Sequence, residues 1–159
     1  MKILFIYLFA VLSLIMPEGN YDQDSLNAEI NKYPVKERID IYIQLSKHFT
    51  DRSFEKSYYY AQKAISLARK INDYENEVNA LHTIAIAHYT QSKYDKSLVY
   101  FTEGLKVSEN NKYDFGKAKS YNGLGVIYKN IGELNTSMDY YLRSEERRVG
   151  KECATGCRS

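Results

Sequence analysis

Histidine and cysteine are the residues of this chain best suited to metal binding or acid–base catalysis, but their spacing favours neither. His82 and His88 are six residues apart, which puts them on different faces of a helix, and His48 stands alone. Cys153 and Cys157 form a C-x-x-x-C pair with no histidine nearby, which is a poor metal site. The sequence has no glycine-rich phosphate loop and no G-x-S-x-G or H-E-x-x-H motif. We therefore predict no catalytic site, no cofactor and no metal site in this chain.

The amino terminus has the pattern of a targeting segment. Lys2 precedes a largely apolar run, residues 3–16, which ends at Pro17, as in a secretory signal peptide. A helix of about 14 residues covers about 21 Å, less than the roughly 30 Å of a bilayer's hydrocarbon core. We expect residues 1–19 to be a signal peptide or an amino-terminal anchor and residues 20–35 to be a linker. The protein is then exported, and is periplasmic or attached to a membrane through its amino terminus.

Residues 36–142 contain one pattern three times, at a regular interval. The clearest matches are Phe54-Glu55-Lys56-Ser57, Tyr94-Asp95-Lys96-Ser97 and Leu134-Asn135-Thr136-Ser137. Apolar residues recur at i, i+3, i+4 and i+7 before and after each match, which is typical of a helix with one apolar face. Two helices in each unit of about 40 residues indicate a solenoid. We predict an all-α solenoid of helical hairpins, with repeats at about 36–74, 75–114 and an incomplete 115–142.

Each repeat keeps a small residue at two positions. The first helix has Ser46, Ala85 or Gly125 there, and the second has Ser57, Ser97 or Ser137. A glycine inside a helix costs about 1 kcal/mol relative to alanine, so its presence needs a structural reason. Small residues at facing positions let two helices approach closely. We therefore expect these residues to be the packing contacts between the two helices of each hairpin.

Local patterns predict how the turns are made. Ser53 is the expected N-cap of the helix that follows it. Ser92 and Asp95 have the S-x-x-D spacing of a capping box. Gly132 can adopt a positive φ in the corresponding turn of the third repeat.

The pattern resembles the tetratricopeptide repeat over about Val35 to Leu142. The residues that carry the resemblance are Leu81, Ile84, Ala85, His88, Tyr94, Ser97 and Phe101 in the second repeat and Tyr121, Leu124, Gly125, Tyr128, Gly132, Ser137 and Tyr141 in the third. The chain departs from the family in three respects: serine replaces the usual alanine of the second helix, no proline closes a repeat, and the unit is longer than the usual length of about 34 residues. By this resemblance, His88 occupies an aromatic packing position in the core.

The resemblance implies that the first helices line a concave groove. Its residues would be Ile43, Lys47, Thr50, Asn79, His82, Ile86, Tyr89, Lys119, Asn122, Val126, Lys129 and Asn130. Amide, lysine and aliphatic groups together suit an extended peptide, whose backbone needs donors and whose side chains need apolar contact. A protein or peptide is thus the expected partner. The alternative is that these residues are simply a solvated face.

The carboxyl-terminal segment, residues 143–159, resembles a translated sequencing adapter, beginning with the run RSEERRVGKEC at Arg143. Both cysteines and four of the seven arginines lie in this segment. We expect it to be a non-native tail, in which case the natural sequence is interrupted near Leu142. The other interpretation is a genuine basic carboxyl terminus.

Charge excludes one class of partner. The chain has 22 Lys and Arg against 20 Asp and Glu, and the segment 143–159 holds five and three of these, which leaves 17 of each sign. A neutral chain has no electrostatic reason to bind nucleic acid.

These observations predict a protein- or peptide-binding scaffold outside the cytoplasm, as the amino-terminal fragment of a longer protein. The alternative is the sensory region of a histidine kinase or of a helix-turn-helix transcriptional regulator that carries such repeats. In that case the output domain would lie beyond Leu142.

Overall fold

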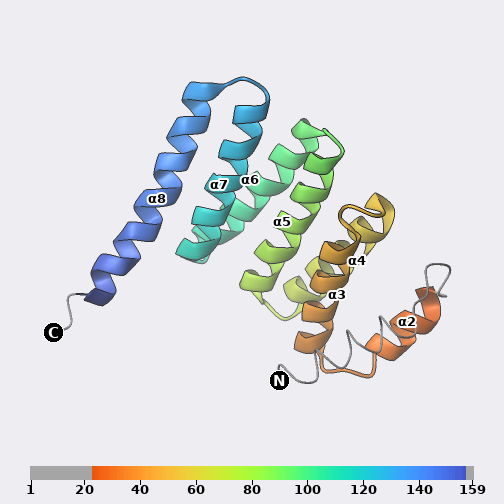
Figure 1. Ribbon diagram of the computed structural model, residues 1–159. Helices are drawn as coiled ribbons and strands as arrows, with labels where there is room; N and C mark the ends of the chain where they lie inside the picture. Colours follow the sequence, from red (N-terminus) through yellow and green to blue (C-terminus); the bar gives the residue numbers. More distant parts are fainter. Residues whose placement is uncertain (1–22, 157–159) are drawn as a thin grey trace. The chain divides into compact units, whose positions relative to one another are not determined.

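The computed structural model describes residues 23–156, without the side chains of 147–156 (Figure 1). The secondary structure of this part is entirely helical. Its helices are α2 (Gln23–Ile30), α3 (Val35–Phe49), α4 (Phe54–Lys70), α5 (Tyr74–Thr90), α6 (Tyr94–Asn110), α7 (Asp114–Asn130) and α8 (Leu134–Gly156). The chain divides into two units, Met1–Pro34 and Val35–Ser159. The expected signal segment lies outside the described residues.

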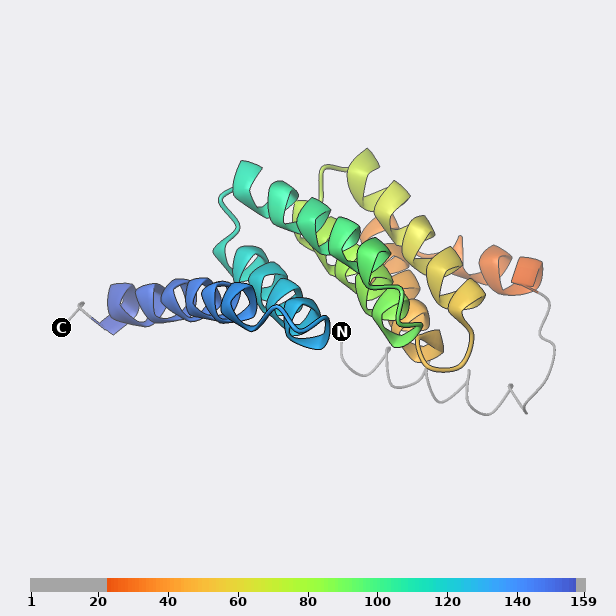
Figure 2. The same ribbon diagram turned by 90° about the horizontal axis from the view of Figure 1, so that it is seen from above.

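The second unit is a stack of helical hairpins. Each helix from α3 to α7 packs against the next one in the sequence, and α5 also contacts α3 and α7. Figure 2 shows α3, α5 and α7 in one layer and α4 and α6 in another. The predicted all-α hairpin solenoid is therefore confirmed. No helix among residues 23–156 combines the length and the apolar character needed to cross a membrane.

One turn geometry recurs after four successive helices. Asn72, Ser92, Lys112 and Gly132 have φ values of 56°, 55°, 53° and 88°. After α5, the amide of Lys93 donates to the His88 carbonyl (3.0 Å) and the amide of Ser92 to the Tyr89 carbonyl (2.8 Å). These two bonds form a Schellman motif, whose left-handed residue ends the helix. The positive φ expected at Gly132 is confirmed.

The predicted capping box at Ser92 is wrong. Ser92 is the left-handed residue that ends α5, so the N-cap of α6 is Lys93, which makes no side-chain capping bond. The prediction for Ser53 is confirmed, since its hydroxyl accepts from the amide of Lys56 at 3.3 Å. Sequence spacing alone did not separate a residue that ends one helix from a residue that begins the next.

A buried serine hydroxyl joins the two helices of each hairpin. The bonds run from Ser97 Oγ to the Ala85 carbonyl (2.7 Å), from Ser137 Oγ to the Gly125 carbonyl (2.8 Å) and from Ser46 Oγ to the Ser57 carbonyl (2.8 Å). The six residues are all buried. In the second and third repeats, this hydrogen bond accounts for serine at a position where the resembled family has alanine. In the first repeat the donor is Ser46 on the first helix, and Ser57 contributes its backbone carbonyl.

Helix α8 presents an apolar stripe to solvent. Leu134, Met138 and Leu142 are 64%, 65% and 58% exposed, and they recur at the i, i+4, i+8 spacing of one helix face. On the opposite side, a Cβ added at Gly125 would lie 2.9 Å from the Tyr141 ring. The helix continues past Leu142, and Ser144 Oγ donates to the Ala118 carbonyl of α7 at 3.0 Å.

Candidate functional site

A groove of about 390 Å³ lies along the first helices of the repeats. Eight of the twelve expected groove residues line it: Lys47, Asn79, His82, Ile86, Tyr89, Lys119, Asn122 and Val126. Four further residues, which are not among the expected ones, also line the groove: Thr83, Phe101, Gly123 and Ile127. The residues that line the groove thus come from α3, α5 and α7, except for Phe101, which comes from α6.

The other four expected residues do not line the groove, because of their burial or their place in the helix. Ile43 is buried. Thr50 follows the end of α3, and its hydroxyl donates back to the Ser46 carbonyl at 3.1 Å. Lys129 and Asn130 are exposed residues of the last turn of α7, and Asn130 Nδ2 donates to a carbonyl of its own helix.

Two lysines give the groove a positive charge. Lys119 Nζ donates to Asn79 Oδ1 at 3.0 Å and lies 5.5 Å from the centre of the Phe115 ring. Burial, and then the nearby charge of Lys47, lowers the pKa of Lys119. No carboxylate is among the residues that line the groove in the described structure. The charges of Lys47 and Lys119 therefore have no compensating carboxylate among the residues that line the groove.

His82 is a neutral polar anchor beneath the groove. Its side chain is 4% exposed, and Nε2 lies 2.8 Å from Ser120 Oγ on α7. Burial, and then the charge of Lys119, lowers its pKa to about 3. The pair has the distance of a nucleophile and its base. However, Ser120 is fully buried, which keeps its hydroxyl from a substrate, and the hydrogen bond joins α5 to α7.

Phe101 and Gly123 form part of the groove floor together. A Cβ at Gly123 would overlap the Phe101 ring, so the absence of a side chain lets this ring lie against α7. The family resemblance implies a groove lined by first helices, so it does not predict Phe101, which belongs to α6. Gly123 was the available clue, because a glycine in a helix interior needs a reason.

The remaining histidines do not enter this groove. His88 is 4% exposed, and its ring stacks on Tyr100 at 5.4 Å. His48 is exposed beside Arg52. Within the described part of the chain, no cluster of three or more His, Cys, Asp or Glu residues could hold a metal ion.

Comparisons with known proteins agree with this architecture. The family model described as tetratricopeptide repeat matches residues 118–148. The crystal structure of the TPR domain of Arabidopsis FLU aligns with a TM-score of 0.65 and 23% sequence identity, covering 74% of this chain and 99% of that one. The fold is that of a tetratricopeptide repeat domain. The fold that the sequence resemblance implies is thereby confirmed.

The family match and the structural match cover different extents of the repeat stack. The family model falls on α7 and the first part of α8, which is the third tetratricopeptide hairpin. At this identity, the likeness to the FLU domain concerns the fold alone. No curated protein gives a significant match to the chain.

Proposed function

We propose that this tetratricopeptide repeat domain is a peptide-binding scaffold whose groove holds an extended peptide with an acidic and an apolar side chain. The observation that carries the proposal is the pair Lys47 and Lys119 in a groove whose lining has no carboxylate. A peptide carboxylate at this place would complete charge-assisted hydrogen bonds, which are among the stronger polar contacts in proteins.

Apolar and amide groups flank the two lysines in the groove. Ile86 is 46% exposed, and Val126 lines the groove with it. Asn79 and Asn122 offer amide groups to a peptide backbone, as an extended ligand requires. Because Asn79 Oδ1 accepts from Lys119, its N–H groups remain as donors.

A peptide array tests this proposal. The full chain would be applied to an array of extended peptides in which each acidic sequence is paired with a version that carries amides in place of carboxylates. We expect preferential binding to the acidic member, and a loss of that preference in Lys119→Ala. Lys129→Ala is the matched control, because this lysine also lies on α7 but outside the groove. Equal binding to both members of each pair would contradict the proposal.

We place this scaffold outside the cytoplasm on the strength of Lys2 and the apolar run that follows it. Cell fractionation of the full chain tests the location. Recovery in the periplasm or with membranes is expected, whereas recovery of a Lys2-bearing full-length chain in the cytosol would contradict it. Alkaline extraction of the membrane fraction then distinguishes an anchor from a cleaved signal peptide.

A further inference from the structure

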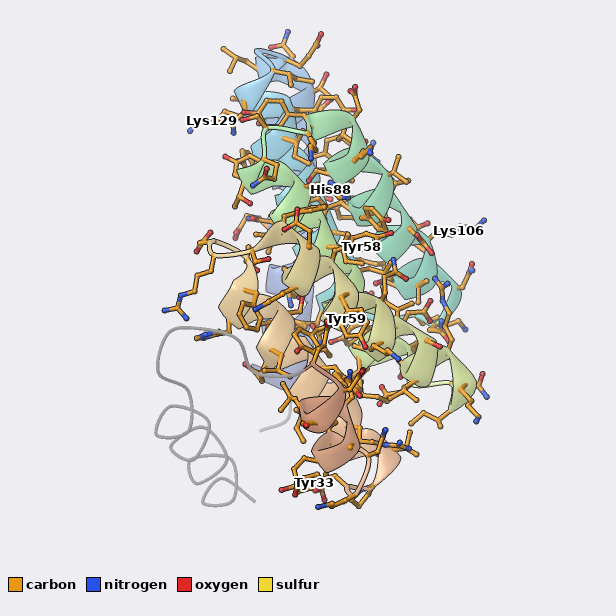
Figure 3. The ribbon with its side chains drawn as sticks, turned by 90° about the vertical axis from the view of Figure 1, so that its right-hand side faces the viewer. Tyr33, Tyr58, Tyr59, His88, Lys106 and Lys129 are labelled. Atoms are coloured by element: carbon orange, nitrogen blue, oxygen red, sulfur yellow. The ribbon has the colours of Figure 1, made fainter. Side chains whose placement is uncertain are left out.

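A second cavity lies where α4, α5 and α6 meet. It has a volume of about 360 Å³ and is lined by Phe54, Tyr58, His88, Lys96, Val99 and Tyr100. None of these residues lines the peptide groove. Figure 3 shows Tyr58 and His88 beside each other, and their ring centres are 6.2 Å apart. The cavity is thus a separate site on the side of the second helices.

Aromatic rings form most of its wall. The rings of His88 and Tyr100 are stacked at 5.4 Å with an angle of 13° between their planes. The Phe54 ring lies 4.9 Å from that of His88, and the hydroxyls of Tyr58 and Tyr100 are 3.3 Å apart. Such a wall favours a flat, unsaturated ligand, since aromatic groups gain from offset stacking and edge contacts.

The polar groups of the cavity complement an anion. Lys96 lines it, and Lys93 Nζ lies 4.9 Å from the centre of the Phe54 ring. His88 is 4% exposed, and its Nδ1 has no hydrogen-bond partner among the described residues. Burial, and then the charges of Lys96 and Lys93, lowers the pKa of His88. The ring is therefore neutral at pH 7, and the charge of the site comes from its lysines.

The corresponding positions 40 residues later, in the third repeat, show which side chains of the cavity are needed for helix packing alone. The aromatic stack persists there, since Tyr128 and Tyr140 stack at 5.3 Å. The cations do not persist, because Glu133 and Thr136 occupy the positions of Lys93 and Lys96 in the third repeat. The lysines are therefore not needed for repeat stacking. In addition, the imidazole of His88 is smaller than the phenol of Tyr128, which leaves room beside it.

We propose that this cavity binds a small aromatic carboxylate, with its ring against Tyr58 and Tyr100 and its carboxylate against Lys96 and Lys93. The cavity volume falls in the usual range for small-molecule sites, about 300–1,000 Å³. A neutral aromatic compound would leave the lysines unused, and an aliphatic acid would leave the rings unused.

Titration with 2-naphthoate tests the proposal directly. The probe is added to the full chain and followed by calorimetry and by chemical-shift changes of the lining residues. We expect saturable binding, and binding of 2-naphthamide weaker by about fivefold, since this probe keeps the ring but lacks the charge. No saturable binding, or equal affinity for the two probes, would overturn the proposal.

Variants locate the probe. Lys96→Thr installs the residue found one repeat later and should weaken naphthoate binding by about threefold to fivefold. His88→Tyr, with the residue of the third repeat, should fill the space and abolish binding while circular dichroism shows an intact helical fold. Lys106→Thr is the matched control, because Lys106 is an exposed lysine of the same helix outside the cavity (Figure 3).

A variant of the peptide groove shows which of the two sites binds the probe. Lys119→Ala should leave naphthoate binding unchanged, since Lys119 does not line this cavity. If Lys119→Ala abolished binding and Lys96→Thr had no effect, the probe would occupy the groove and the proposal would be wrong. This outcome would leave the peptide-binding proposal intact, so the two can fail separately.

Discussion

The serine hydroxyls between paired helices illustrate how one atom can decide a packing contact. Each lies in a buried helix–helix contact and donates to a carbonyl of the partner helix, as Ser97 does to Ala85 at 2.7 Å. Alanine would fill nearly the same space, but it would leave out this bond. The preference for serine is therefore a matter of hydrogen bonding as well as size.

Ser97→Ala measures this contribution. The variant loses one buried hydrogen bond and creates little space, so we expect the free energy of unfolding to fall by about 1 kcal/mol. Urea denaturation of both proteins gives the difference. Ser66→Ala is the control, because Ser66 is exposed on α4, and it should change stability by less than about 0.5 kcal/mol. Equal effects of the two substitutions would show that the Ser97 bond contributes nothing measurable.

His82 couples stability to pH through its burial. Its pKa is about 3 in the folded protein and about 6.5 when unfolded. Because the folded value is the lower one, the unfolded chain binds the extra proton, and stability is lost as pH falls from about 6.5 towards 3. Between pH 7 and pH 5 this histidine alone should remove about 2 kcal/mol. The pH dependence of urea unfolding measures the loss.

A His82→Gln variant isolates this histidine from the others. The variant should lose markedly less stability than the wild type over the same pH interval, whatever its stability at pH 7. His88 contributes in the same direction, since its pKa is also lowered, and it is unchanged in both proteins. Parallel pH curves for wild type and variant would contradict a neutral, buried His82.

The spacing of residues in the first helices predicts much of the groove but not its floor. Helical spacing identifies residues on the exposed side of a first helix, and Lys47, Asn79 and Lys119 do line the groove. Helical spacing does not predict that Phe101, from a second helix, reaches the groove. The Phe101 ring can lie there only because Gly123 has no side chain. Ile43 shows the opposite error, since it has the right spacing but is buried.

The turns have one geometry at four places because each helix ends in the same way. A residue with positive φ follows α4, α5, α6 and α7 at evenly spaced positions. Only the last of these is glycine, so Asn72, Ser92 and Lys112 hold a conformation that side chains disfavour. Each repeat thus consists of two helix-plus-turn segments of equal length.

Ser92→Gly tests this interpretation against the capping box. Glycine adopts a positive φ without steric cost, so we expect the variant to be more stable by about 0.5–1 kcal/mol. If Ser92 instead capped α6, its loss would cost stability. Thermal and urea unfolding distinguish the two signs. The reverse change, Gly132→Ser, should destabilise the protein by a similar amount, about 1 kcal/mol, and serves as the matched comparison.

At the scale of the whole domain, each hairpin depends on its neighbours. Helix α5 packs against α3, α4, α6 and α7, whereas α8 packs chiefly against α7. A repeat stack of this kind is stabilised by the sum of its hairpins and the contacts between adjacent ones. The periodicity of the sequence was enough to predict the stack, because every hairpin has the same pattern of apolar residues and makes the same contacts with its neighbours.

This arrangement predicts a gradient of protection along the chain. Among helices α3 to α8, hydrogen–deuterium exchange should be slowest in α5 and fastest in α8, because amides open most easily where a helix has a single neighbour. The exposed stripe of Leu134, Met138 and Leu142 adds no packing energy to α8. Accordingly, Met138→Lys should leave both the melting temperature and the protection of α7 unchanged. If α8 were as protected as α5, another surface would have to cover this stripe in solution, and Met138→Lys would then speed exchange in α8.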